Sequence, residues 1–201
     1  MDRILKIVMV GAAGSGKTSL RNYFLHRNYT WQCAPTTNPD FVSTSTPLGE
    51  RGDVAMQVWD TGGDSVVTES LAQDADGLVL VFDTTRGRRE LDPWLAALKV
   101  PAVLVRAKAD QPMDRALWTR EGIVCLEASA QTGDGVDCVF QTIAGLCIDQ
   151  WRGEAIGMRK RMSRHGDPIP YHSFEFDEMP LAKRRTNARL RSMVRRMFCM
   201  A

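Results

Sequence analysis

Short runs of apolar and β-branched residues alternate with stretches of helical spacing along the first three quarters of the chain. A run such as Leu78–Phe82 is apolar at every position, which is typical of a strand buried on both faces of a mostly parallel sheet. The runs predict strands at Ile4–Val10, Phe41–Leu48, Val54–Trp59, Leu78–Phe82, Ala102–Arg106 and Ile123–Leu126. The helical spacing predicts helices at Lys17–Arg27, Arg89–Lys99, Met113–Glu121 and Gly135–Trp151. The pattern therefore predicts an α/β fold with a six-stranded, mostly parallel sheet flanked by helices.

One pair of strands departs from this parallel arrangement. The segment 48–54 contains Gly49 and Gly52 between two apolar runs, and it is too short for a crossover between parallel strands. We expect it to be the turn between two antiparallel strands at one edge of the sheet.

The pattern changes after Trp151. Residues 152–180 contain several glycines and prolines, so we expect an extended connector there. In residues 181–201, apolar positions recur at helical spacing between arginines, which predicts a basic amphipathic helix. These apolar positions are Leu190, Met193, Val194 and Met197. The chain is thus divided into a folded domain at 1–151, a connector at 152–180 and a basic C-terminal extension at 181–201.

Charge follows the same division. The whole chain of 201 residues has a net charge of +2. Residues 1–151 have 14 basic and 19 acidic side chains, whereas residues 152–201 have 12 basic and 5 acidic ones. The folded part is therefore acidic, at −5, and the C-terminal part is basic, at +7. A hydrophobic content of 44% with 25% charged residues is that of an ordinary globular protein and argues against a disordered or fibrous one.

The sequence argues against a secreted protein and against a membrane-spanning one. The first residues lack the apolar core of a signal peptide, and no apolar run approaches the ~18 residues of a spanning helix. The five cysteines are widely spaced and form no Cys-x-x-Cys pair. We therefore expect a soluble protein of the reducing cytoplasm without structural zinc.

The clearest chemical motif is Gly11-Ala12-Ala13-Gly14-Ser15-Gly16-Lys17-Thr18, which fits G-x-x-x-x-G-K-[ST]. It follows the first predicted strand and opens the first predicted helix, as a phosphate-binding loop requires. In such a loop the backbone N–H groups point inward, and the helix N-terminus adds partial positive charge. Lys17 would contact the outer phosphates of a nucleoside triphosphate, and the Thr18 hydroxyl would bind Mg²⁺.

Four later motifs follow in order along the chain. They are Pro35-Thr36-Thr37-Asn38-Pro39-Asp40-Phe41, Trp59-Asp60-Thr61-Gly62-Gly63-Asp64, Ala107-Lys108-Ala109-Asp110 and Glu127-Ala128-Ser129-Ala130-Gln131. Together with the phosphate-binding loop they resemble the motifs of the Ras-superfamily small GTPases, most closely the Rab-like members. The resemblance covers residues 4–151 and implies the small GTPase form of the P-loop NTPase fold.

The resemblance implies GTP or GDP and Mg²⁺ as ligands. Thr18, Thr36 and Asp60 would organise the metal, and the Asp110 carboxylate would accept the two N–H donors of guanine. Segments 28–40 and 61–74 would be the switches that the γ-phosphate orders. The implied nucleotide-binding residues are Ala13, Gly14, Ser15, Gly16, Lys17, Thr18, Ser19, Thr36, Gly63, Lys108, Asp110, Ser129, Ala130 and Gln131.

Three departures from the family pattern affect function. Asp64 stands where the family usually has the glutamine that orients the attacking water, and a carboxylate next to a triphosphate is repelled by it. We therefore expect slow or negligible GTP hydrolysis. Ala107 replaces the asparagine of N-K-x-D and cannot make its hydrogen bonds, and Gln131 replaces a lysine.

The version Trp-Asp-x-Gly-Gly-Asp also resembles the motif of the Rab-like subunit of the intraflagellar transport machinery. This resemblance implies a nucleotide-loaded subunit of a protein assembly, with coiled-coil partners in a cilium or flagellum. The alternatives are an active GTP-hydrolysing Rab-type switch of membrane traffic and, outside the family, a P-loop kinase of small molecules. The kinase interpretation leaves Asp110 and Ser129-Ala130 unexplained.

The basic C-terminal extension leaves three interpretations open. Cys199 is third from the end instead of fourth, so the extension does not match C-a-a-X and we expect no prenyl anchor. The helix could lie on an anionic membrane, dock on a protein partner, or form a solvated tail or fold back on the acidic domain. Nucleic-acid binding fits poorly, because Phe198 is the only aromatic residue among the arginines.

Overall fold

The computed structural model describes residues 4–31, 34–62, 65–83, 91–96, 98–112 and 122–162. The strands are β1 (Leu5–Val10), β2 (Asp40–Pro47), β3 (Asp53–Asp60), β4 (Gly77–Phe82), β5 (Ala102–Arg106) and β6 (Val124–Glu127). The helices are α1 (Lys17–His26), the 3₁₀ turn η1 (Gly49–Arg51), α2 (Ser65–Gln73), α3 (Asp92–Ala96) and α4 (Val136–Met162). All six predicted strands are therefore present, each within a residue or two of its predicted bounds.

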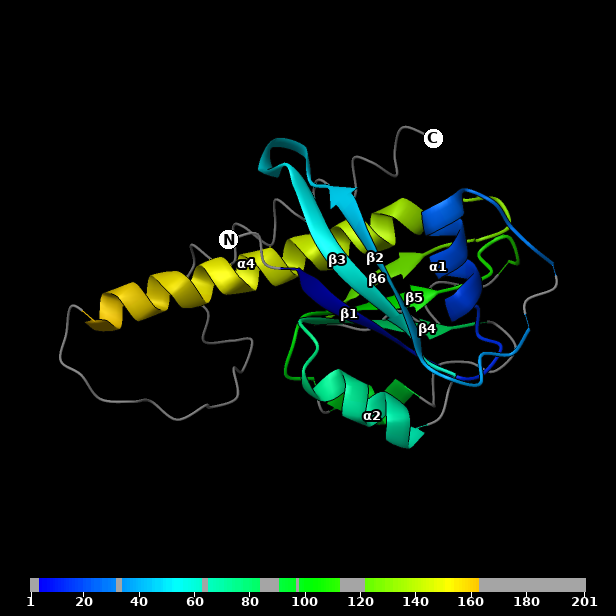
Figure 1. The fold of residues 1–201 in the computed structure, drawn as a ribbon, viewed down its shortest axis with the longest axis horizontal. Helices are drawn as coiled ribbons and strands as arrows, with labels where there is room; N and C mark the ends of the chain where they lie inside the picture. The colour runs from blue at the N-terminus through cyan, green and yellow to red at the C-terminus, as the bar shows by residue number, and fades with distance from the viewer. Residues whose placement is uncertain are drawn as a thin grey trace. The chain divides into compact units, whose positions relative to one another are not determined.

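The strands form one sheet in the order β2-β3-β1-β4-β5-β6 (Figure 1). Every neighbouring pair is parallel except β2 and β3, which are antiparallel in a register that pairs Asp40 with Asp60 and Pro47 with Asp53. The prediction of a mostly parallel six-stranded sheet is confirmed, as is the antiparallel pair at its edge. In this arrangement the carboxyl ends of β1, β3, β4, β5 and β6 all meet at one edge of the sheet.

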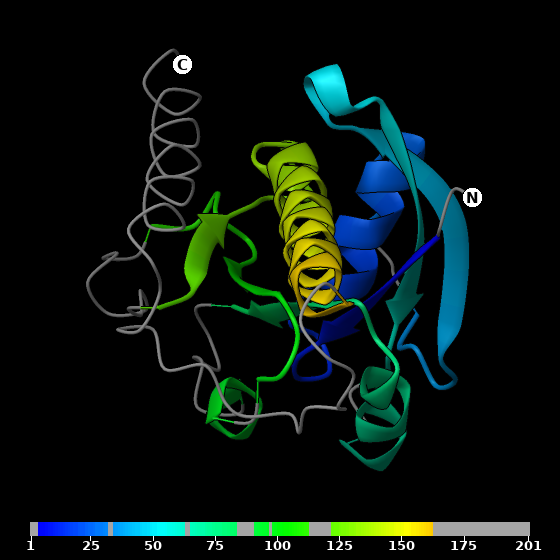
Figure 2. The same cartoon turned by 90° about the vertical axis from the view of Figure 1, so that its left-hand side faces the viewer.

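Helices cover both faces of this sheet. Helices α1 and α4 lie on one face, and α2 and α3 lie on the other (Figures 1 and 2). On the first face Phe24 of α1 stacks on Phe140 of α4, with 4.1 Å between ring centroids. On the second face Leu91 and Leu95 join the buried side chains of β1, β4 and β5 in a continuous core. Burial on both faces explains why β4 is apolar at every position.

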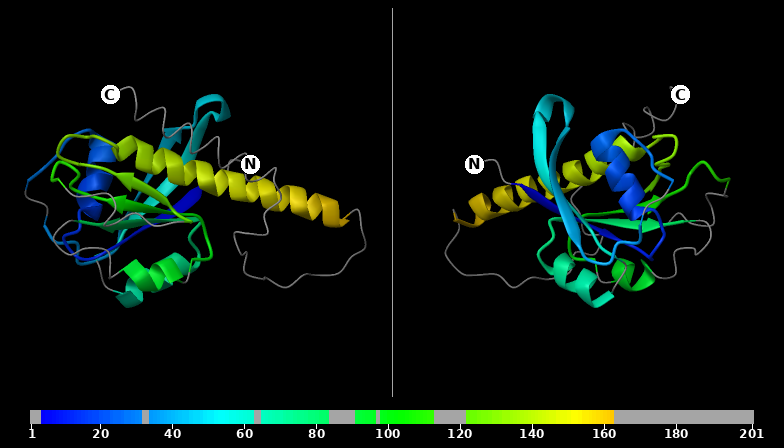
Figure 3. Two further views of the ribbon diagram at one scale, coloured as in Figure 1. Left: turned by 180° about the vertical axis from the view of Figure 1, so that it is seen from behind. Right: turned by 45° about the vertical axis from the view of Figure 1, so that its right-hand side comes forward.

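One helix lies where the sequence predicts none, and the end of another prediction is wrong. Helix α2 falls within segment 61–74, for which the family resemblance implies only a switch. Helix α4 runs on to Met162 (Figure 3), so neither the predicted helix end at Trp151 nor the start of an extended connector at residue 152 is correct. Gly153 and Gly157 each cost a helix only about 1 kcal/mol relative to alanine, and the charged and apolar helix formers around them outweigh that cost. In the described part of the chain no helix is both long and apolar enough to span a bilayer.

Three predicted segments lie outside the described residues. These are the helix at 113–121, the part of the connector from residue 163 onward, and the basic extension at 181–201.

Gly77, the first residue of β4, provides a test of the packing between the sheet and α4. A Cβ added there would lie 2.7 Å from Sγ of Cys147 and 3.0 Å from Ile143. Cys147 is itself buried, its thiol donates to the Asp76 carbonyl oxygen at 3.2 Å, and burial raises its pKa to about 12. We expect Gly77→Ala to destabilise the protein by about 1–3 kcal/mol through overpacking, measured by urea denaturation.

Gly145 in α4 is the matched control. A Cβ there meets nothing within 4 Å, so Gly145→Ala is expected to stabilise the protein by about 0.5–1 kcal/mol through helix propensity. Equal effects of the two substitutions would contradict the close approach at Gly77.

Candidate functional site

The phosphate-binding loop joins β1 to α1 and is packed against the end of a neighbouring strand. A Cβ at Gly11 would overlap the carbonyl oxygen of Val81 in β4, so only glycine allows this approach. Helix α1 then begins at Lys17, with Gly16 at its N-cap in a left-handed conformation. The described helix has no side-chain cap and no acidic residue in its first turn. Its first N–H groups and the positive end of its dipole are therefore available to an anion.

Lys17 brings a buried positive charge into this loop. The side chain is only 4% exposed, and Nζ donates to the carbonyl oxygens of Gly11 at 2.8 Å and Ala12 at 2.9 Å. These two bonds fix the ammonium group inside the loop, where it can contact the outer phosphates of a bound nucleotide.

The three residues expected to organise a metal come together at the end of the loop, although they lie on three segments. The Thr18 hydroxyl donates to Oδ2 of Asp60 at 2.5 Å, and the Thr36 hydroxyl is 2.9 Å from that of Thr18 and 3.5 Å from Asp60 Oδ2. The close approach of Thr36 to the end of β3 is also seen at Gly62, where a Cβ would overlap the Thr36 carbonyl oxygen.

This cluster fits Mg²⁺. Asp60 is fully buried, and its Oδ1 has no hydrogen-bond partner, although a buried carboxylate oxygen is costly to leave unsatisfied. Two hydroxyls and one carboxylate are hard oxygen donors, and Mg²⁺ commonly binds through few protein ligands plus substrate phosphates and water. Within the described ranges there is no group of three or more His, Cys, Asp or Glu that could hold a metal.

A pocket of about 260 Å³ lies next to the loop. It is lined by residues from the phosphate-binding loop, from α1 and from the loops that follow α1, β5 and β6. These are Gly16, Ser19, Leu20, Tyr29, Trp31, Ala107, Lys108, Asp110, Gln111, Ala130 and Gln131. The pocket therefore unites three of the five motifs that the sequence singled out for the nucleotide, and its position beside the phosphate loop suits a base and ribose.

The polar groups of the pocket are held in place by hydrogen bonds. Asp110 accepts a hydrogen bond on Oδ1 from the hydroxyl of buried Ser129 at 2.6 Å, which orients the carboxylate and leaves Oδ2 for a ligand. Lys108 reaches back to the phosphate loop, with Nζ 2.5 Å from Oδ2 of buried Asp83 and 3.1 Å from the Gly14 carbonyl oxygen. Lys108 also has a φ of 55°, a left-handed conformation that is uncommon for lysine.

The structure thus brings most of the predicted residues to one edge of the sheet. Gly16, Ser19, Lys108, Asp110, Ala130 and Gln131 line the pocket, and Ser129 supports it through Asp110. Ala13, Gly14 and Ser15 lie in the phosphate loop, where the Ser15 hydroxyl is buried without a partner. Gly63 and Asp64 lie outside the described residues.

Sequence reasoning missed three notable contributors. Tyr29 and Trp31 line the pocket, with rings 5.2 Å apart in an edge-to-face arrangement, and Trp31 is 75% exposed. Two aromatic residues just after a predicted helix were the available signal. Asp83 anchors Lys108, and the signal for it was an acid directly after a fully apolar strand.

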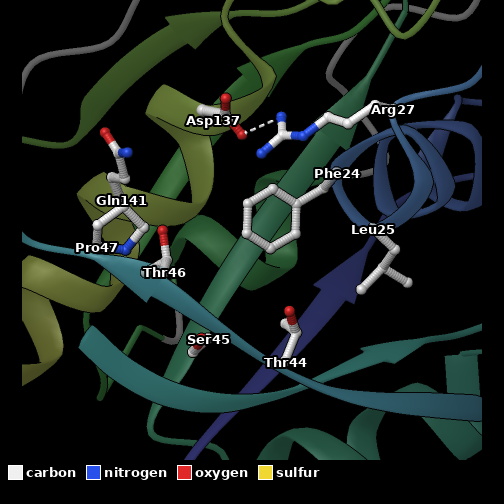
Figure 4. Close-up of a pocket in the computed structure, with 9 residues that line it drawn as sticks. All are labelled: Phe24, Leu25, Arg27, Thr44, Ser45, Thr46, Pro47, Asp137 and Gln141. Carbon is white, nitrogen blue, oxygen red and sulfur yellow. Dashed lines mark hydrogen bonds and ion pairs between the residues drawn. The ribbon is translucent and has the colours of Figure 1, made fainter.

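A second cavity, of about 280 Å³, lies between α1, β2 and α4 (Figure 4). Phe24 forms part of its wall, Thr44 and Thr46 line it from β2, and the ion pair of Arg27 with Asp137 closes one side. It shares no lining residue with the first pocket and contains no residue from the motifs above.

Comparison with known proteins agrees with this geometry. Residues 6–110 match the family model described as Ras of Complex, Roc, domain of DAPkinase. The chain is 31% identical over 185 residues to Ras-related protein Rab-18 of Lymnaea stagnalis, covering 81% of this chain and 90% of that protein. It is 28% identical to Ras-related protein SEC4 of Candida albicans, over 78% of this chain and 83% of that one. Ras-related protein Rab-7b of Paramecium octaurelia is also 28% identical, over 77% and 86% respectively.

Proposed function

Because the chain belongs to the Rab-like small GTPases of the Ras superfamily, we propose that it binds GTP and GDP with Mg²⁺ and hydrolyses GTP slowly. The observation that supports the proposal is the convergence of three groups at one edge of the sheet. These groups are the phosphate loop around Lys17, the oxygen cluster of Thr18, Thr36 and Asp60, and the pocket in which Asp110 is held by Ser129.

In this proposal each group recognises one part of the nucleotide. Lys17 and the N–H groups at the start of α1 bind the phosphates. The cluster at Asp60 holds Mg²⁺, which neutralises phosphate charge when bound. Asp110 accepts two N–H donors from the guanine ring, a pair that adenine does not offer. Adenine nucleotide as the co-purifying ligand, identified by chromatography of the denatured protein, would contradict this assignment and favour the small-molecule kinase.

Slow hydrolysis follows from Asp64, which stands at the position of the water-orienting glutamine. A carboxylate is repelled by the charged γ-phosphate and cannot donate a hydrogen bond to a water or a phosphate oxygen. We therefore propose a nucleotide-loaded subunit of a protein assembly instead of a rapidly cycling switch. Among assemblies, the motif Trp-Asp-x-Gly-Gly-Asp favours intraflagellar transport, with coiled-coil protein partners in a cilium or flagellum.

The hydrolysis proposal is tested by single-turnover GTP hydrolysis with purified, GTP-loaded protein. We expect the wild type to turn over slowly and Asp64→Gln to be faster by about tenfold or more, because the amide restores a neutral group that can position the attacking water. The control is Glu50→Gln, which also replaces an acid by glutamine, at an exposed position on the β2–β3 turn, and it should leave the rate unchanged. Wild-type turnover as fast as that of an ordinary small GTPase would instead support the active membrane-traffic switch.

A further inference from the structure

The loop that contains Asp110 is anchored from behind by one buried arginine. Arg106 is the last residue of β5, is 4% exposed, and does not line the pocket. Since side chains alternate along a strand, Arg106 and the pocket-lining Ala107 point in different directions. A buried guanidinium next to the base-reading loop calls for an explanation, because arginine is seldom buried unless it is paired and hydrogen-bonded.

The guanidinium bonds on both sides of Asp110. Its Nη1 donates to the carbonyl oxygen of Gln111 at 2.7 Å, and Nη2 is 3.5 Å from the carbonyl oxygen of Ala109. These are the two residues that flank Asp110 in the chain. One rigid, planar group therefore contacts the backbone before and after the residue that would read the base.

The arginine is itself fixed to the next strand. Arg106 and Glu127 are register partners in the parallel pair β5–β6. Glu127 Oε1 accepts a hydrogen bond from Nε at 3.1 Å and forms an ion pair with Nη2 at 3.0 Å. Ser129, which orients Asp110, lies two residues after Glu127. This ion pair therefore adds to the hydrogen bonds that join the loop after β5 to the loop after β6, such as that from the Ala109 N–H to the Ala128 carbonyl oxygen. Its exposure is low, so it is stronger than a solvated ion pair.

We propose that Arg106 is a positioning residue that places Asp110 for guanine recognition. The family's asparagine is replaced by Ala107, which cannot help to position the loop through a side-chain hydrogen bond. This inference rests on the proposed binding of guanine nucleotides and adds a residue on which the selectivity for guanine depends. The left-handed conformation of Lys108 shows that the loop adopts a backbone path that local preference alone does not favour, so an external anchor is needed.

The test measures base selectivity, which general loss of stability does not change. Inosine diphosphate differs from GDP only in lacking the exocyclic amine, one of the two donors that Asp110 would accept. The full chain is stripped of nucleotide, and the dissociation constants of GDP and inosine diphosphate are measured by calorimetry. We expect the wild type to prefer GDP by about tenfold or more, as for a hydrogen bond to a charged group.

Arg106→Lys keeps the charge but loses the planar fork that reaches both carbonyls. We expect it to reduce the preference for GDP over inosine diphosphate by about fivefold, since one of the two bonds to the Asp110 loop is lost. Arg51→Lys is the matched control. Arg51 also pairs with an aspartate, Asp149, at 2.8 Å, but it lies on the β2–β3 turn and should leave the preference unchanged.

A second variant covers the case in which Arg106→Lys does not fold, which circular dichroism would show. Glu127→Gln keeps the length of the side chain and one acceptor oxygen. It is expected to reduce the preference for GDP over inosine diphosphate about twofold, since the acceptor of the bond from Arg106 is no longer charged. Amide hydrogen exchange should rise at Ala109 and Gln111, whose N–H groups bond to the carbonyl oxygens of Ala128 and Lys108.

The outcomes separate the two proposals. The variants could fold, bind GDP and inosine diphosphate more weakly by the same factor, and so keep the wild-type preference. That result would overturn the role of Arg106 while leaving the proposed binding of guanine nucleotides intact. A wild-type protein that binds neither nucleotide, or binds them without preference, would overturn the proposed guanine recognition and with it the role of Arg106.

Discussion

Replacement of Lys17 by methionine is expected to lower the affinity for GDP and GTP by about 150- to 5,000-fold, because removing one partner of a buried charge pair costs about 3–5 kcal/mol. Lys17 is 4% exposed and is held inside the loop by the carbonyl oxygens of Gly11 and Ala12. The loop would desolvate a bound phosphate, and without Lys17 the loop would have no lysine to neutralise the phosphate charge. Methionine keeps the length of the side chain and removes the charge. The measurement is calorimetric titration of nucleotide-free protein with each nucleotide.

Lys6→Met is the control for this substitution. Lys6 lies on β1 with Nζ 5.4 Å from the ring centroid of Trp59, away from the loop and the pocket. It should bind nucleotide like the wild type. The affinity of Lys17→Met could instead stay within a factor of about three of the wild-type value, a difference of less than about 0.7 kcal/mol. That result would show that the loop binds phosphate through its N–H groups alone or binds none.

The substitution Asp110→Asn is expected to change which base is bound. Guanine offers two N–H donors, and a carboxylate can accept both, whereas an amide can accept one and must donate the other. The amide oxygen can keep the bond from the Ser129 hydroxyl, now 2.6 Å from Oδ1, and its NH₂ group would then face an N–H donor of guanine. We expect GDP to bind about 100-fold more weakly, and xanthosine diphosphate to become the tighter ligand, because its carbonyl oxygen accepts from the amide.

The matched control is Asp134→Asn. Asp134 lies in the loop that follows β6 and accepts a hydrogen bond from the Thr132 hydroxyl at 2.7 Å, but it does not line the pocket. Its substitution should not alter the preference between GDP and xanthosine diphosphate. If Asp110→Asn also retains the wild-type preference, Asp110 does not read the base.

The strands could be predicted from the sequence because their signal is local. A strand buried on both faces must be apolar at nearly every position, and Leu78–Phe82 shows this without reference to any other part of the chain. Helix α2 and the last turns of α4 were not predicted for the opposite reason. Their helical spacing is weak or interrupted by glycine, and packing on the sheet or the neighbouring turns decides whether such segments are helical.

The candidate site divides in the same way. The phosphate loop is a contiguous motif, so its glycines and Lys17 could be named directly from spacing. Tyr29, Trp31 and Asp83 have no such motif. The folding of the loops places Tyr29 and Trp31 in the pocket and Asp83 against the lysine that lines it, Lys108. The orientation of Asp110 by Ser129 depends on two strands being neighbours in the sheet.

By itself, the sequence determined the class of fold, the phosphate loop and the ordered family motifs, because each is encoded by residues close together in the chain. Only the tertiary structure decided that Thr18, Thr36 and Asp60 form one oxygen cluster with an unsatisfied buried carboxylate oxygen, and that Arg106 anchors the Asp110 loop through Glu127. The physical reason is that the strength of these contacts depends on burial and on distances of a few ångströms between segments far apart in sequence. Burial and these distances cannot be obtained from the order of the residues, because they depend on the register of the strands in the sheet.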